Sequence, residues 1–150
     1  MNLNNILIRK GYSKIKLKKI NTNHFEIKAK LNGVNGRFIL DTGASNSCID
    51  INLAEEFKLN VKDSETKAAG AGAIGMETKI SSKNKIELKK WSYKNLNMVL
   101  LDLSHVNTAL TEHDAKAVHG IIGADILEKG KAIIDYKNKC IYLKKLVFRY

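Results

Sequence analysis

The residues of this sequence that could do chemistry begin with an aspartate. Asp41 follows the apolar residues 38–40 and precedes Thr42 and Gly43. One carboxylate can take a proton from water while a second, protonated carboxylate donates a proton to a substrate carbonyl. Two carboxylates a few ångströms apart do not both ionise readily, so they share a proton and titrate as a unit. Asp41 is therefore a candidate for acid–base hydrolysis of a peptide bond if a second carboxylate reaches it.

Cysteine and histidine side chains offer other candidate chemistry. Cys48 and Cys140 lie in apolar surroundings without a cysteine–histidine motif, and we interpret both as buried thiols. His113 and His119 lack a third residue at metal-ligand spacing, which favours surface or turn positions over a metal site. The sequence therefore predicts no metal and no cofactor.

Short strands separated by turn signals must position Asp41. Residues 24–31 alternate between apolar and polar types and predict a strand. Asparagine and glycine make 32–36 a turn, and 37–40 is the return strand that leads into Asp41. Further strands are expected at 14–20, 48–51, 86–91, 96–103, 120–123, 132–136 and 140–146.

The expected helices are few and brief. Residues 2–10 form one, and a second begins at an Asn52 N-cap with Glu55 three residues later. The remaining two are expected at 111–118 and 124–129. Many short strands with a few brief helices predict a mostly-β barrel or sandwich.

Three further features follow Asp41 along the chain. Residues 67–76 form a glycine-rich hairpin, residues 121–123 read Ile-Ile-Gly, and a short helix and a terminal hairpin come last. Together with Asp-Thr-Gly, this order resembles the retropepsin-like aspartic proteases, the single-domain relatives of pepsin, over roughly 25–146. The resemblance implies an aspartic endopeptidase with a mostly β, closed acid-protease barrel and two or three short helices. A basic leader at 1–22 would precede the domain at 23–150.

The resemblance also assigns roles around Asp41, the catalytic residue. Thr42 would bond across a dimer to the partner loop, and Gly43 would let backbones approach closely where a Cβ would block them. Ala44 lacks the hydroxyl that pepsin-like enzymes often carry there, as in the retroviral enzymes. Because fewer hydrogen bonds to a carboxylate disfavour its charged form, we expect a working pH less acidic than pepsin's.

Two other segments receive roles from the same resemblance. A flap hairpin would fold over an extended peptide and exclude water. Ile-Ile-Gly would brace the Asp41 loop by core packing. The flap residues are Gly70, Ala71, Gly72, Ala73 and Ile74, and the bracing residues are Ile121, Ile122 and Gly123.

One motif supplies only one carboxylate, and the chain is too short for a duplicated two-lobed enzyme. The simplest second carboxylate is Asp41 of another copy on a two-fold axis, so we expect a homodimer that acts on polypeptides. Asp102, Asp125 and Asp135 are intrachain alternatives. Asp125 suits the start of the expected helix, where an acidic residue complements the dipole.

Charge is the last feature to interpret. The net charge is +11, and residues 1–37 hold nine basic residues and one acid, a local balance of +8. A nucleic-acid-binding domain at 9–37 is an alternative, but the few aromatic residues there favour a solvated basic face. A non-catalytic peptide-binding or dimerisation module is the other alternative. Without a visible secretory signal or apolar span, we expect a cytoplasmic protein without a membrane span.

Overall fold

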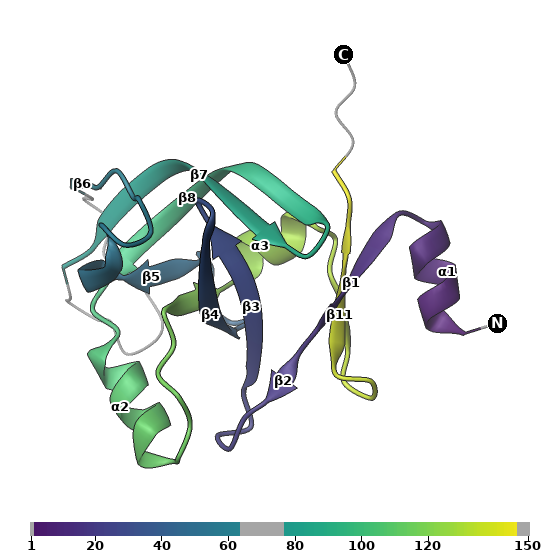
Figure 1. Ribbon diagram of the computed structural model, residues 1–150. Coiled ribbons are helices and arrows are strands. Elements are labelled where there is room, and N and C mark those ends of the chain that lie inside the picture. The colour runs from purple at the N-terminus through teal and green to yellow at the C-terminus, as the bar shows by residue number, and fades with distance from the viewer. Residues whose placement is uncertain (1, 64–76, 147–150) are drawn as a thin grey trace.

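The structure is a computed structural model that describes residues 2–63 and 77–146 (Figure 1). Within these ranges the chain forms eleven strands, three α-helices and one 3₁₀ helix. The strands are β1 (Tyr12–Lys16), β2 (Lys18–Lys19), β3 (Phe25–Leu31), β4 (Val34–Leu40), β5 (Cys48–Asp50), β6 (Lys62–Asp63), β7 (Lys79–Leu88), β8 (Trp91–Leu101), β9 (Gly120–Ile122), β10 (Ile133–Asp135) and β11 (Cys140–Lys144). The helices are α1 (Leu3–Arg9), η1 (Ile51–Leu53), α2 (Ser104–Glu112) and α3 (Ala124–Lys129).

Six strands close into a barrel. Their order is β3-β4-β9-β5-β8-β7, and pairing of β7 back onto β3 closes the ring at Lys30↔Glu87 and Leu31↔Ile86. Strands β2 and β6 extend the sheet beyond this ring. Inward side chains of these strands form the main core, which includes the fully buried Ile27, Phe38 and Trp91. The predicted mostly-β closed barrel with few helices is confirmed.

The β3–β4 hairpin delivers Asp41 to one end of the barrel. Asn32 and Gly33 both have positive φ, 51° and 84°, which suits the tight hairpin turn that asparagine and glycine favour. The turn is shorter than the predicted 32–36, because β4 already begins at Val34. Gly36 lies inside the strand, where an added Cβ would stand 2.8 Å from the Phe38 ring.

Strand β9 runs parallel to β4 and fixes its end. The register pairs Ile39 with Ile121 and Leu40 with Ile122. Glycine is required at the start of β9, because a Cβ on Gly120 would lie 2.3 Å from the Cys48 carbonyl oxygen. Pairing with the predicted apolar strand at 120–123 therefore fixes the position of the end of β4 and of Asp41, which follows it.

The N-terminal residues join a second sheet of order β1-β11-β10. Strand β1 pairs antiparallel with β11 from Tyr12↔Lys144 to Lys16↔Cys140, and Figure 1 shows the two side by side next to α1. The Trp91 indole N–H donates to the Lys144 carbonyl oxygen at 2.9 Å, which connects the barrel to this sheet. The segment predicted as a basic leader thus packs against the C-terminal hairpin.

Two helix predictions were wrong. The helix expected at 111–118 is α2, Ser104–Glu112; it follows Leu103, its N-cap residue, and the Ser104 N–H donates to Asp102 just before it. The helix expected after Asn52 is η1 followed by turns, and the capping side chain is Asp50, which accepts the Asn52 N–H. Helices α1 and α3 lie where the sequence predicts them.

Candidate active site

Asp41 lies directly after β4 and is half-buried. Its backbone N–H donates to the Ile122 carbonyl oxygen at 2.9 Å, which continues the β4–β9 pairing by one residue. Its carboxylate accepts the Gly43 N–H at 2.9 Å. Among the described residues no other donor reaches this carboxylate, so most of its acceptor capacity is open to a water or a substrate.

The loop after Asp41 is held against α3 by backbone contacts. The Ala44 N–H donates to the Asp41 carbonyl oxygen at 3.2 Å, and the Ala124 N–H donates to the Ala44 carbonyl oxygen at 2.7 Å. A Cβ on Gly123 would lie 2.5 Å from that same Ala44 oxygen. The Ile-Ile-Gly segment thus contacts the Asp41 loop through its backbone, and the glycine allows the close approach.

A buried serine and an aspartate join the other end of the loop to α3. Asp125 accepts the Ser47 N–H at 3.0 Å and the Ser47 hydroxyl at 2.7 Å. It also accepts the Ile126 N–H at 2.8 Å. The Gly123 N–H in turn donates to the Ser47 Oγ at 3.0 Å. The sequence analysis missed Ser47, because a serine in a short loop carries no signal of burial.

Asp41 opens into a small pocket of about 180 Å³ at the end of the barrel. Phe25 and Tyr136 form its aromatic side, with ring centroids 5.1 Å apart. Tyr136 is 71% exposed, so its aromatic ring is accessible to solvent in the same pocket as the Asp41 carboxylate. The described residues that line the pocket include one carboxylate and are Asn23, His24, Phe25, Leu40, Asp41, Thr42, Ile134 and Tyr136.

Sequence reasoning missed the aromatic and histidine part of this pocket. His24, Phe25 and Tyr136 come from two segments more than a hundred residues apart. Only the β10–β11 hairpin brings Tyr136 back to the start of β3, and no local pattern shows that contact. Thr42 and Gly43, which the sequence did predict here, are exposed in the described chain.

The other aspartates have structural partners. The Ser104 hydroxyl and N–H donate to Asp102 and lower the pKa of its carboxyl. The Asn138 side chain and N–H donate to Asp135 and lower the pKa of that carboxyl. Asp102 is exposed between β8 and α2, and Asp135 is the half-buried last residue of β10; neither is among the residues that line the Asp41 pocket. No intrachain carboxylate therefore joins Asp41 in its pocket within residues 2–63 and 77–146.

Both cysteines are buried and free, as predicted. Burial raises the pKa of the Cys48 thiol to about 12, and the charges of Asp125 and Asp41 add to the rise. A thiol with such a pKa stays protonated near neutral pH and is a poor nucleophile. Cys48 therefore packs behind the Asp41 loop and does not compete with Asp41 for the chemistry.

The histidines singled out in the sequence do not meet at one site. His119 accepts the Arg37 N–H through Nδ1 at 2.9 Å and packs edge-on against Phe57, whereas His113 is the exposed C-cap of α2. In the part of the chain that the structure describes, no three histidine, cysteine or acidic side chains cluster as metal ligands. No helix there has the length and apolarity needed to cross a membrane.

The predicted flap, Gly70 to Ile74, lies outside the described residues. Its described flanks pair antiparallel, with Lys62 opposite Ile80 and Asp63 opposite Lys79. The two strands that lead into and out of the predicted flap are therefore adjacent.

Comparison with known proteins agrees with this geometry. A family model described as aspartyl protease matches residues 27–126. A retropepsin-like aspartic protease from Rickettsia conorii is similar over 89% of this chain and 90% of its own, with a TM-score of 0.59 and 20% identity. No curated protein sequence matches significantly.

Two further solved structures share the fold. EIAV protease in complex with the inhibitor HBY-793 covers 82% of this chain and 91% of its own, with a TM-score of 0.53 and 20% identity. The retroviral protease-like domain of Ddi1 from Leishmania major covers 81% and 93%, with a TM-score of 0.52 and 18% identity. The predicted retropepsin-like fold is confirmed.

Proposed function

The chain belongs to the aspartyl protease family, and we propose that it is an endopeptidase whose catalytic pair is Asp41 from each of two copies. The observation that carries the proposal is the placement of Asp41. Its backbone is tied to β9, its carboxylate accepts one hydrogen bond, and it faces a pocket beside an exposed aromatic ring.

The proposed reaction needs one ionised and one protonated carboxyl group. The ionised Asp41 takes a proton from a water molecule, and the resulting oxygen attacks the peptide carbonyl carbon. The protonated Asp41 of the other copy donates to the carbonyl oxygen, which gives a tetrahedral intermediate. The Asp41 that took the proton from water then gives it to the amide nitrogen, and the other, now ionised Asp41 takes a proton from a hydroxyl of the intermediate as the carbon–nitrogen bond breaks. The Gly43 N–H holds the carboxylate in one orientation for these transfers.

Two observations support a second copy as the source of the other carboxyl group. The pocket has one carboxylate among the described residues, as noted above. Strand β10 is the last strand of its sheet, and its outer edge carries no described partner strand. Ile134 of β10 lines the Asp41 pocket, so a copy that pairs at this edge would stand next to Asp41.

Hydrolysis of casein over a pH series tests the proposal. We expect cleavage that a pepstatin-type transition-state mimic inhibits and that Asp41→Asn abolishes. The expectation of a working pH less acidic than pepsin's stays a prediction, and the same series tests it. Sedimentation of Asp41→Asn should show a dimer. Peptide binding without hydrolysis in the wild-type chain would favour the non-catalytic module instead.

A further inference from the structure

A groove that Asp41 does not line lies on the outer face of β3 and β4. Two cavities of about 630 and 550 Å³ share Lys18, Glu26, Lys28 and Asn35, so they form one continuous groove. Strands β1 and β2 form one wall of the groove, and the β7–β8 turn closes one end. We call it the basic groove, because six exposed lysines line it: Lys16, Lys18, Lys28, Lys30, Lys89 and Lys116.

The charges of these lysines are not balanced locally. The groove contains two carboxylates, and each is paired: Glu26 lies 3.7 Å from Arg37, and Glu87 lies 3.5 Å from Lys85. Within residues 2–63 and 77–146, no carboxylate lies within ion-pair distance of the six lysines. Like charges around one concave surface concentrate the positive potential there. An anionic partner that binds in the groove would reduce the repulsion among the lysines.

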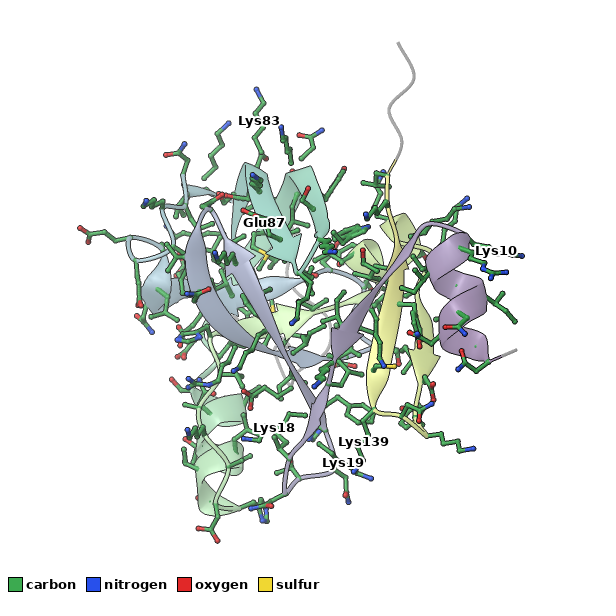
Figure 2. All side chains as sticks on the ribbon, turned by 45° about the vertical axis from the view of Figure 1, so that its right-hand side comes forward. Lys10, Lys18, Lys19, Lys83, Glu87 and Lys139 are labelled. Carbon is green, nitrogen blue, oxygen red and sulfur yellow. The ribbon has the colours of Figure 1, made fainter. Side chains whose placement is uncertain are left out.

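The groove also offers apolar contacts and a strand edge. Ile15, Leu17 and Ala29 of the main core also line it, each at most 7% exposed. Strand β2 is the first strand of the eight-stranded sheet, so its outer edge has no described partner. Figure 2 shows Lys18 and Lys19 on this strand, at the end of the molecule opposite Lys83. An extended peptide can bind such an edge by backbone pairing while its side chains meet the groove.

These features favour an acidic peptide over a nucleic acid. No Phe, Tyr or Trp is among the described residues that line the basic groove, and the ring of its one histidine, His119, already contacts the Arg37 N–H and Phe57. A peptide that alternates acidic and apolar residues would place carboxylates on the lysines and apolar side chains near Ile15 and Leu17.

The basic groove ends next to the Asp41 pocket. Glu26 lines the groove, and its chain neighbour Phe25 lines the pocket. Strand β2 spans both, because Lys18 pairs with Glu26 and Lys19 pairs with Phe25. Neighbouring side chains of a strand point to opposite faces of the sheet, so a chain that occupies the groove would have to pass around the edge strand β2 to reach Asp41.

We propose that the basic groove binds an acidic, extended segment of the polypeptide substrate, outside the cleaved bond. The identification of the partner as substrate rests on the proposed protease function, whereas the binding itself does not. The bound segment would raise the local concentration of the scissile region at Asp41.

A binding measurement in the full-length Asp41→Asn chain tests this proposal without cleavage. The probe is a fluorescein-labelled peptide of alternating glutamate and valine, followed by anisotropy at increasing sodium chloride. We expect Lys28→Glu combined with Lys30→Glu to weaken binding at least about tenfold, because two attractive charges become repulsive. Both residues are exposed, so the variant should keep its fold, which circular dichroism checks.

The matched control is Lys10→Glu combined with Lys83→Glu, which changes the net charge equally outside the groove. We expect this control to weaken binding less than about twofold, and glutamine in place of glutamate in the probe to remove binding. Equal weakening by both double variants, or no binding, would overturn the proposal. Stronger binding of a single-stranded oligonucleotide would also overturn it. If the peptide binds as expected but wild-type protein cleaves nothing, the protease proposal fails and the groove stands.

Discussion

Asp41 begins a short loop, and Asp125 of α3 binds the other end of that loop, but the surroundings of the two carboxylates differ. Asp125 accepts three hydrogen bonds, two of them from the fully buried Ser47. Asp41 accepts one from the residues that the structure describes, the N–H of the exposed Gly43. The first carboxylate has most of its acceptor positions filled by the protein, and the second leaves most of them for other molecules.

This difference separates a structural role from a chemical one. Asp125 joins the loop to α3, and the loop in turn holds Asp41 beside β9. A carboxylate that the fold already saturates cannot readily bind a catalytic water. We therefore expect changes at Asp41 to affect activity and changes around Asp125 to affect stability.

The largest expected effect is on activity, at Asp41. Asp41→Asn keeps the shape of the side chain but removes the proton-transfer group, so the rate of casein cleavage should fall at least about 1,000-fold. The free energy of unfolding, from a denaturant titration, should change by less than about 0.5 kcal/mol. A variant that unfolds easily but still cleaves would reverse the roles assigned to the two aspartates.

The next effect is on stability, at Asp125. Asp125→Ala leaves the N–H and hydroxyl of buried Ser47 without acceptors, and each such group costs about 1–3 kcal/mol. We expect the free energy of unfolding to fall by about 3 kcal/mol in total. Asp63→Ala, which removes an exposed carboxylate, is the control and should leave it unchanged. Equal melting temperatures for the two variants would show that Asp125 does not hold the loop.

A smaller loss of stability is expected for a substitution at Gly123, where the Ile-Ile-Gly segment contacts the loop after Asp41. Gly123→Ala forces the Ala44 carbonyl to move, and such overpacking costs about 1–3 kcal/mol. We therefore expect thermal unfolding at lower temperature together with reduced cleavage. An unchanged cleavage rate in Gly123→Ala would mean that this contact does not position Asp41.

The smallest effect concerns the thiol behind the loop. Cys48 is buried and its pKa is raised to about 12, so at pH 8 Ellman's reagent should react with no thiol of the folded chain and with both thiols in denaturant. Between the ordinary thiol pKa and about 12, Cys48 stays protonated in the folded state but loses its proton in the unfolded state. The free energy of unfolding should therefore fall as the pH rises through this range. Rapid labelling of Cys48 in the native protein would show that the loop opens.

Local patterns in the sequence predict the parts of the site that lie within one hairpin. The alternation of β3, the Asn32-Gly33 turn and the aspartate after β4 all follow from neighbouring residues. The start of α2 was misplaced because the turn in which Asp102 accepts the Ser104 N–H, directly before the helix, was not recognised as a helix signal. In that case a local signal existed and was read wrongly.

The contacts that complete the site join residues far apart in the chain. Closure of the barrel by β3 and β7, the Ser47–Asp125 bonds and the meeting of Phe25 with Tyr136 all depend on tertiary packing. No periodicity encodes them. The family resemblance supplied the role of Asp41, and the structure added the residues that hold it and line its pocket.

A subunit-mixing experiment tests most directly whether two copies form one catalytic site. Wild-type and Asp41→Asn chains are mixed in equal amounts, refolded together and assayed for cleavage at constant total protein. If each site needs both aspartates, the rate should be about one quarter of the wild-type rate, because random pairing makes one dimer in four fully wild type. A rate of about one half would mean that each chain works alone, and it would contradict the shared site.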